Sequence, residues 1–382
     1  MKNVVLAELV CFLLFVGFVM IEEPAIIGVY IAALAAFGFY MKKKQSAKLV
    51  ALEQDFADNM GTAGLTAFIL SLILPFAIMG DSYWLQVLAF ATINGMMALG
   101  LNFMTGHAGL ICLGYAGFMA IGAYTVGILT LKCGVSFWLA LPIAGVLASL
   151  SGVLMGLPAL RVKGHYLGLV TIAFGLVVQE LILNADDLTG GPDGLINIPS
   201  PTIGSFDLGQ PTDLGFMNMP YVFNFYVLGV ILMAISAWIV YKLSNSFFGL
   251  SLNAMREDEL AAQCYGMNLT SYKLYAFGAG AFFGGISGGV YASMMNFIAP
   301  ENFNYGLSII VISMVILGGM DSIPGAIVGA ILLTCFPEKF RAFEDFRVMF
   351  YGFIIVFCLL FMREGLLPFK HRIFKLGNKE AE

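Results

Sequence analysis

The chain has 382 residues, of which 60% are hydrophobic and 11% are charged, and its mean hydropathy is +0.90. Soluble domains carry about 25% charged residues, so this composition excludes a water-soluble globular protein. The apolar stretches reach the roughly 20 residues that a helix needs to cross a bilayer, and the alternating pattern of barrel strands is absent. Because a backbone in lipid must satisfy its own hydrogen bonds, the sequence predicts an all-α polytopic membrane protein. The net charge of −5 carries little information.

Twelve apolar segments follow one another along the chain, and we expect each of them to form a helix. They span residues 4–20, 25–41, 61–80, 84–104, 109–131, 137–157, 166–184, 221–243, 274–295, 306–319, 323–337 and 348–362. No small-x-small cleavage site follows the first segment, so we interpret it as a retained helix rather than a signal peptide. The segments 306–319 and 323–337 are short and interrupted by Gly and Pro, which is typical of helices that line a cavity or pack closely on a partner.

The basic residues set the expected orientation, because the short inner loops of membrane proteins are rich in Lys and Arg. With the N-terminus inside, fifteen of the nineteen basic residues lie inside and four lie outside. The inner group is Lys2, Lys42, Lys43, Lys44, Lys48, Arg161, Lys163, Lys242, Arg256, Lys273, Arg363, Lys370, Arg372, Lys375 and Lys379, and the outer group is Lys132, Lys339, Arg341 and Arg347. We therefore expect both termini and the polar stretch 246–268 in the cytoplasm, and the loop 185–220 on the outer face.

The segment 41–59 (MKKKQSAKLVALEQDFADN) separates the first two apolar segments from the other ten. Its basic start suits the anionic surface of the inner leaflet. We expect residues 1–59 to form an N-terminal appendage of two transmembrane helices plus this basic linker. Residues 60–370 are expected to form the main transmembrane domain, and residues 371–382 a cytoplasmic tail.

The longest polar break in the second half of the chain is 246–268, SFFGLSLNAMREDELAAQCYGMN. Its run from Arg256 to Ala262 (Arg256-Glu257-Asp258-Glu259-Leu260-Ala261-Ala262) has helical composition, and Gly266 follows as a stop. A short charged helix between two membrane spans is typical of a docking site for a soluble partner. An ordinary solvated loop is the alternative interpretation.

Motifs for catalysis are missing from the sequence. It has no Gly-x-x-x-x-Gly-Lys-Ser/Thr loop for nucleotide phosphates, no Gly-x-Ser-x-Gly elbow and no His-Glu-x-x-His helix. Six cysteines are scattered, mostly inside apolar segments, and three histidines lie far apart, so we expect no metal site, no cofactor and no enzyme activity. A proton-coupled secondary transporter would need a carboxylate buried within a span, and Glu180, near the outer end of its segment, is the only candidate.

Glycine is concentrated in the runs 106–124 and 278–289, where small residues allow helices to approach closely. The density of glycine from Gly106 through Gly109 and Gly114 predicts a broken or re-entrant helix. On the outer side, Thr189-Gly190-Gly191-Pro192-Asp193-Gly194 has the composition of a turn. This turn either caps the preceding helix or forms a rigid rim to which a partner docks.

Together, several runs resemble the permease subunits of branched-chain amino-acid ABC importers, the LivM type, over roughly residues 84–368. The similar runs are 105–124, LRVKGHYL at 160–167, LTGGPDG at 188–194, AMREDELAA at 254–262 with GMN at 266–268, VILGGMDSIPG at 315–325, and 333–347 with REGLLP at 363–368. The chain departs from the common pattern in places. Leu110, Cys112 and Tyr115 stand where polar residues are frequent, Leu176 and Gln179 where Glu and Arg are common, and Asp321 where Gly is frequent.

The resemblance implies an ABC importer permease fold with broken or re-entrant helices in residues 60–370. It also implies that the chain forms half of a pathway for leucine, isoleucine and valine across the bacterial inner membrane. Permeases for urea and short amides share much of this frame and remain an alternative, as does a secondary transporter. The implied partners are a second homologous permease, two ATP-binding subunits, an external substrate-binding protein and the lipid bilayer, with no nucleic acid.

The same resemblance assigns roles to residues. Arg256, Glu257, Asp258, Glu259, Ala262 and Gly266 form the expected set that couples to the ATPase. Thr189, Gly190, Gly191, Pro192 and Gly194 form the expected rim for the binding protein, and Gly106, Gly109, Gly114, Gly318 and Gly319 are expected along the pathway or the broken helix. Replacing Glu257 and Glu259 with Lys is expected to leave the chain inserted and stable but to uncouple it from the ATPase.

Overall fold

The computed structural model describes residues 2–20, 30, 60–78, 81–162, 165–204, 206–213, 218–339, 349, 352, 356 and 365–367. Several features expected from the sequence lie wholly or almost wholly outside the described residues. These are the second helix (25–41), the basic linker (41–59), the last apolar segment (348–362) and the tail (371–382).

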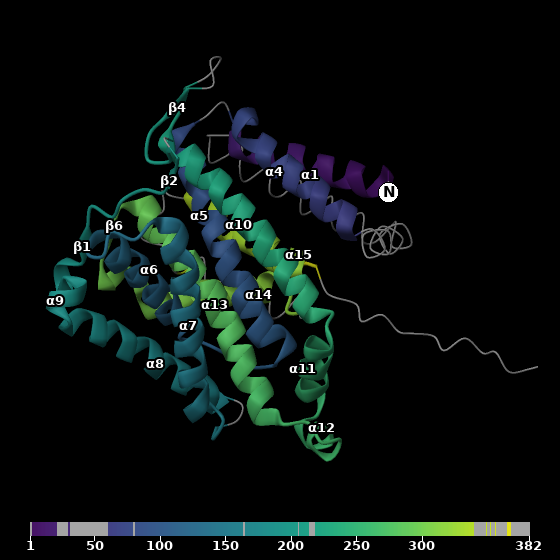
Figure 1. Cartoon of the computed structure of the whole chain (residues 1–382). Coiled ribbons are helices and arrows are strands. Elements are labelled where there is room, and N and C mark those ends of the chain that lie inside the picture. Colours follow the sequence, from purple (N-terminus) through teal and green to yellow (C-terminus); the bar gives the residue numbers. More distant parts are fainter. Residues whose placement is uncertain are drawn as a thin grey trace, which may run out of the picture.

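The described chain is mostly helical, which confirms the predicted class of membrane protein (Figure 1). The long helices are α1 (Lys2–Met20), α4 (Met60–Ala77), α5 (Ser82–Asn102), α6 (Tyr115–Leu131), α7 (Phe137–Ala159), α8 (His165–Asn184), α10 (Tyr221–Ser244), α13 (Leu269–Met295), α14 (Tyr305–Gly318) and α15 (Ile323–Lys339). The shorter ones are the π-helix η1 (Phe103–His107), α9 (Asp186–Thr189), η2 (Gly191–Asp193), α11 (Phe247–Glu257), α12 (Glu259–Cys264) and η3 (Pro300–Phe303).

Five helical stretches in the described residues are long and apolar enough to cross a membrane: Ser82–His107, Phe137–Ala159, Tyr166–Asn184, Tyr221–Ser244 and Pro300–Gly318. Shorter apolar helices run over Val5–Met20, Gly61–Ala77 and Tyr115–Leu131. The longest helix, α13, has 27 residues but is absent from both groups. It is rich in glycine and buried along most of its length, so it packs against other helices instead of presenting large apolar side chains to lipid.

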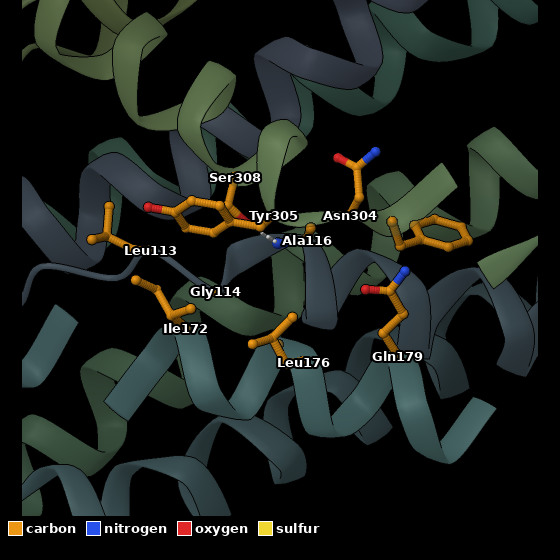
Figure 2. Close-up of a pocket in the computed structure, with 11 residues that line it drawn as sticks. Leu113, Gly114, Ala116, Ile172, Leu176, Gln179, Asn304, Tyr305 and Ser308 are labelled. Atoms are coloured by element: carbon orange, nitrogen blue, oxygen red, sulfur yellow. Dashed lines mark hydrogen bonds between the residues drawn. The ribbon is translucent and has the colours of Figure 1, made fainter. Parts of the chain in front are cut away.

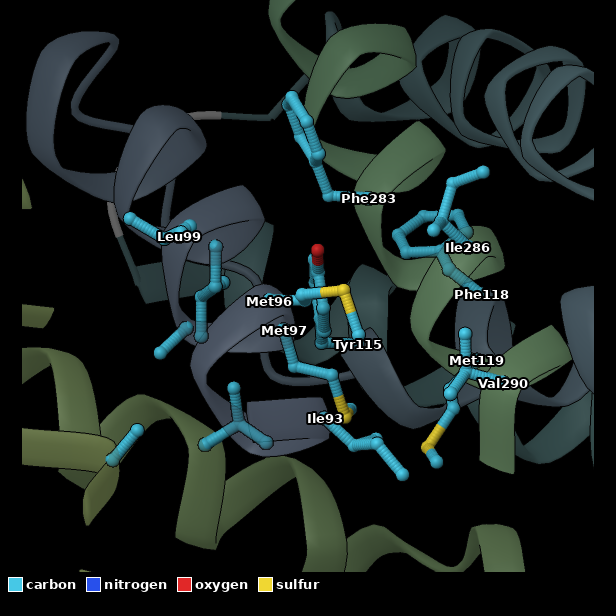
Figure 3. Close-up of a cluster of buried hydrophobic side chains, with 14 of the residues drawn as sticks. Ile93, Met96, Met97, Leu99, Tyr115, Phe118, Met119, Phe283, Ile286 and Val290 are labelled. Atoms are coloured by element: carbon cyan, nitrogen blue, oxygen red, sulfur yellow. The ribbon is translucent and has the colours of Figure 1, made fainter. Parts of the chain in front are cut away.

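The core forms around α13, which packs against α7, α6 and α5. Figure 3 shows its apolar side chains facing those of α5 and α6; the labelled residues are Phe283, Ile286 and Val290 of α13, Ile93, Met96, Met97 and Leu99 of α5, and Tyr115, Phe118 and Met119 of α6. The backbones come very close, since a Cβ atom on Gly122 of α6 would lie 2.1 Å from the carbonyl oxygen of Gly285. The buried hydroxyl of Tyr115 donates to the carbonyl oxygen of Gly280 at 2.7 Å, which fixes α6 against α13.

Short strands gather at one end of the bundle, opposite α11 and α12 (Figure 1). They form antiparallel pairs, in which β1 (Leu195–Ile196) pairs with β6 (Phe297–Ile298), β2 (Thr202–Ile203) with β3 (Phe206–Asp207), and β4 (Thr212–Asp213) with β5 (Asn218–Met219). The β1–β6 pair joins the segment after α8 to the segment after α13. The region expected as a loop over 185–220 therefore contains α9, η2 and five two-residue strands among its described residues.

Helix α1 packs on α4 and is attached to the bundle through the end of α15. Lys339 Nζ donates to the carbonyl oxygen of Val19 at 2.7 Å and lies 4.4 Å from the ring centroid of Trp84. An ammonium over an indole ring is attracted by the π face. One lysine thus connects α1, α5 and α15.

The turn between α14 and α15 receives hydrogen bonds from the far C-terminal part of the chain. The amides of Leu366 and Leu367 donate to the carbonyl oxygens of Leu317 and Gly318 at 2.9 and 3.0 Å. Gly365 lies against the turn so closely that a Cβ atom on it would be 2.4 Å from Gly319 Cα. The last carbonyls of α14 therefore find their partners in this segment.

Candidate functional site

The polar stretch 246–268 forms two helices where the sequence predicts one. Helix α11 ends at Glu257 and α12 begins at Glu259, because Asp258 adopts an extended conformation between them (φ −151°, ψ 106°). Its carboxylate accepts hydrogen bonds from the amides of Leu260 at 2.9 Å and Ala261 at 3.0 Å. Asp258 is therefore the N-cap of α12, and the prediction of a continuous helix over Arg256–Ala262 is wrong at this residue.

The α11–α12 segment presents apolar side chains beside its charges. Leu260 is 70% exposed and Tyr265 is 90% exposed, whereas Ala262 is buried. The side chain of Glu257 is 75% exposed. Gly266 has a φ of +83°, and a Cβ atom there would meet nothing within 4 Å. Large apolar groups exposed beside carboxylates have the chemistry of a protein-docking surface.

Glu259 faces the bundle rather than a partner. Its Oε1 lies 2.6 Å from Lys273 Nζ at the start of α13, and the Lys273 side chain is only 10% exposed. The ion pair therefore ties α12 to α13.

Arg256 also points inward. Its Nη1 donates to the carbonyl oxygen of Gly106 in η1 and to Oδ2 of Asp321 in the α14–α15 turn. Its Nη2 lies 3.9 Å from the exposed carboxylate of Glu257. Sequence reasoning singled out Arg256 but missed its partners. The signal for Asp321 was its place in a turn where a glycine is common in similar proteins.

The helix break falls where the glycine run begins. Helix α5 passes into η1, residues 108–114 are not helical, and α6 starts at Tyr115. Gly106 lies in η1 and Gly109 has a φ of +67°. Gly114 lies so close to α8 that a Cβ atom would be 1.8 Å from the carbonyl oxygen of Thr171.

Gly318 and Gly319 lie at the other break, where α14 ends and the turn to α15 begins. Both breaks therefore contribute to the same region, because Arg256 contacts Gly106 in one and Asp321 in the other. Of the five glycines expected along the pathway, Gly114 lies apart, on the α8 side.

A small pocket lies beside Gly114, between the start of α6, α8 and the start of α14 (Figure 2). It is too small to hold an amino acid, and its lining residues are Leu113, Gly114, Ala116, Ile172, Gly175, Leu176, Gln179, Phe303, Asn304, Tyr305 and Ser308. Most polar groups here are engaged: the amide of Ala116 donates to Ser308 Oγ at 2.9 Å, and Gln179 Nε2 donates to the carbonyl oxygen of Pro300 at 3.3 Å. The first turns of α6 and α14 both open on this pocket.

The turn at the strand end is tightly built. Thr189 is buried, and its hydroxyl donates to the carbonyl oxygen of Ile182 at 2.6 Å. Gly190 ends α9, and Gly191 and Pro192 start η2. Gly194 has a φ of +70°, and a Cβ atom on it would lie 2.0 Å from the carbonyl oxygen of Ile298. Only glycine fits there, so the turn is held against the segment that contains β6.

The part of the chain that the structure describes offers no site for metal chemistry. It contains no group of three or more His, Cys, Asp or Glu residues that could hold a metal ion. Glu180, the candidate for proton coupling, is exposed and lies 3.4 Å from the side-chain nitrogen of Asn184, rather than in the core.

A bundle of apolar helices, five of which are long enough to cross a bilayer among the described residues, defines a multi-pass membrane protein. The chain matches the family described as "Branched-chain amino acid transport system / permease component" over residues 83–359, and it belongs to that family. It is therefore a LivM-like permease component of a branched-chain amino acid ABC transporter, and not an enzyme.

Two curated relatives are high-affinity branched-chain amino acid transport system permease proteins LivM. The protein from Escherichia coli is 37% identical over 75% of this chain and 70% of its own length, and that from Salmonella typhimurium is 34% identical over 83% and 77%. A third relative, an autoinducer 2 import system permease protein LsrC from Yersinia pseudotuberculosis, is 31% identical over 56% of this chain and 64% of its own length. No solved structure matches the chain.

Proposed function

We propose that this chain forms half of the translocation pathway for leucine, isoleucine and valine in an ATP-driven importer. The observation that carries the proposal is the match to LivM permeases over most of the chain. ATP hydrolysis takes place in partner subunits, and the chain supplies the membrane path and the surface on which those subunits act.

The ATPase docks on the α11–α12 segment. The exposed side chains of Leu260 and Tyr265 supply the apolar contact, and Glu257 and Asp258 supply charge that orients the partner. Ala262 is buried inside the segment, and Gly266 forms the turn at its end. Arg256 and Glu259 hold it on the bundle, so they act in coupling through their internal contacts.

The rim Thr189, Gly190, Gly191, Pro192 and Gly194 receives the substrate-binding protein. Its hydrogen bonds and its fit against Ile298 support a rigid surface, which costs little entropy to dock. This assignment places the strand end outside and the α11–α12 end in the cytoplasm of a bacterial inner membrane, with both termini on the cytoplasmic side.

The substrate passes close to the two helix breaks, at Gly106, Gly109 and Gly114 on one side and Gly318 and Gly319 on the other. The second wall of the path belongs to a homologous permease. The small pocket beside Gly114 is not assigned to the substrate, because it is smaller than an amino acid and its few polar groups are already bonded. In this scheme residues 60–370 are the permease domain, residues 1–59 are an appendage and residues 371–382 are a tail.

Co-purification and uptake test the proposal. The tagged chain is expressed with its second permease, ATPase subunits and binding protein, purified in detergent and reconstituted with ATP inside the liposomes. We expect two ATPase subunits and one further permease to co-purify, and leucine-loaded binding protein to stimulate ATP hydrolysis and leucine uptake. Urea, acetamide and autoinducer 2 serve as competitors. Uptake of one of these in place of leucine contradicts the substrate assignment, and uptake by the chain alone on a proton gradient contradicts the mechanism.

A further inference from the structure

The carboxylate of Asp321 lies at a point where segments far apart in the chain meet. Arg256 of α11 donates both to this carboxylate and to the carbonyl oxygen of Gly106 in η1. The Arg256 guanidinium therefore joins the α11–α12 segment (called the docking segment below), the break after α5 and the turn between α14 and α15. The Asp321 side chain is 10% exposed and that of Arg256 is 29% exposed, so water screens the pair poorly.

The backbone conformation of Asp321 indicates that aspartate is present for its carboxylate. Its φ of +73° is a conformation that glycine adopts freely and aspartate adopts at a cost. Asn102 of α5 holds this turn, because its Oδ1 accepts from the Asp321 amide at 3.0 Å and its Nδ2 donates to the carbonyl oxygen of Ser322 at 3.3 Å. Glycine would satisfy the same backbone contacts, so the carboxylate is what aspartate adds at this position.

His107 strengthens the connection between η1 and the docking segment. Its Nδ1 lies 3.2 Å from Asn253 Oδ1 of α11 and 3.6 Å from Asp321 Oδ1, and its Nε2 lies 2.8 Å from Ser244 Oγ at the end of α10. The imidazole is buried. Gly109 completes the enclosure, since a Cβ atom there would lie 2.8 Å from Arg256 Cγ.

We propose that Asp321 is a positioning residue that, through Arg256, transmits displacement of α11 to the two helix breaks. The inference rests on the proposed docking of an ATPase on α11–α12. When that partner moves α11, Arg256 pulls on the Gly106 carbonyl and the Asp321 carboxylate together, so η1 and the α14–α15 turn move with α11. Without the carboxylate, α11 moves while the α14–α15 turn stays behind.

The test uses the complete transporter in proteoliposomes and measures leucine uptake per ATP hydrolysed, with thermal stability of the same complexes. Asp321→Gly suits the backbone and removes the carboxylate. We expect it to lower uptake per ATP by about 2- to 30-fold, the range of single-residue effects on coupling between sites. Arg256→Gln is expected to do the same. Glu338→Gln, which alters a carboxylate bonded to Tyr83 at the other end of α15, is the matched control and should keep the wild-type ratio.

The double variant Arg256→Gln/Asp321→Gly separates positioning from folding. Each single change leaves a charge without its close partner in a largely buried place, whereas the double change removes both charges, so we expect stability to return in the double variant. Uptake per ATP is expected to stay low, because the connection is still absent. Recovery of uptake together with stability overturns the proposal, as does a wild-type ratio in Asp321→Gly.

Hydrogen exchange of the chain in nanodiscs gives a measurement that needs no partner. Asp321→Gly should speed exchange in α11 and in η1 together, and unchanged exchange in both overturns the proposal. A wild-type complex that fails to assemble or to import leucine contradicts the proposed function instead, and the exchange measurement then still decides on the connection.

Discussion

The two glutamates of the α11–α12 segment should respond differently to charge reversal. Glu259 lies 2.6 Å from Lys273, a side chain that is only 10% exposed, while Glu259 itself is 33% exposed. Glu257 is 75% exposed and 3.9 Å from Arg256. Glu259→Lys therefore sets two like charges beside each other in a poorly hydrated place, and Glu257→Lys changes a charge in water. The expectation that both reversals leave the chain stable applies to Glu257 alone.

The magnitude follows from the burial of the pair. Exposed ion pairs contribute about 0–1 kcal/mol, and breaking a buried pair costs about 3–5 kcal/mol. The Glu259–Lys273 pair is buried on one side and open on the other, so we expect Glu259→Lys to destabilise the chain by about 2 kcal/mol. Glu257→Lys should change stability by less than about 0.5 kcal/mol, as is usual for exposed positions.

Denaturant unfolding of the purified chain in mixed micelles measures both variants, and binding of the ATPase subunit is measured on the same samples. The swapped pair Glu259→Lys/Lys273→Glu should recover most of the lost stability. Glu257→Lys should weaken ATPase binding without a change in unfolding midpoint. Equal midpoints for Glu259→Lys and Glu257→Lys, or no recovery in the swapped pair, refute the reasoning from burial.

Three further predictions concern the rim, the core and the docking surface. Gly194→Ala forces a Cβ atom against the carbonyl oxygen of Ile298, so we expect a loss of about 1–3 kcal/mol and weaker stimulation by the binding protein; Gly204→Ala, at a similar φ of +63° but with open space around it, is the control. Tyr115→Phe removes the bond to Gly280 and should cost about 1–2 kcal/mol in unfolding free energy. Leu260→Ser with Tyr265→Ser should leave the unfolding midpoint unchanged and weaken ATPase binding by about 1–3 kcal/mol; unaltered binding moves the docking surface elsewhere.

The sequence predicts the helices well because a bilayer demands long apolar runs, and such runs are visible without any knowledge of contacts. The break after α5 was also predicted, since glycine at Gly106, Gly109 and Gly114 leaves little support for a regular helix. The break at Asp258 was not, although an aspartate followed by Glu259 is a common start of a helix. The residues on both sides of Asp258 favour a helix, so the sequence around it resembles one continuous helix.

The contacts of Arg256 could not be read from the sequence. Gly106 and Asp321 are 150 and 65 residues away, and no local pattern connects positions at such separations. Arg256 and Glu259 sit in a charged run that resembles a solvated face, yet both side chains turn to the bundle. Three-dimensional packing thus divides the run into side chains that face a partner and side chains that hold the segment in place.

The hydrogen bonds from Leu366 and Leu367 to the end of α14 have a consequence for biosynthesis. The ribosome makes α14 and its turn about fifty residues before these partners, so the carbonyls of Leu317 and Gly318 lack them during that interval. In a nascent chain that stops short of residue 365, the turn that carries Asp321 lacks these two hydrogen bonds. The region on which the α11–α12 segment rests is therefore complete only in a chain that has been translated as far as Leu367.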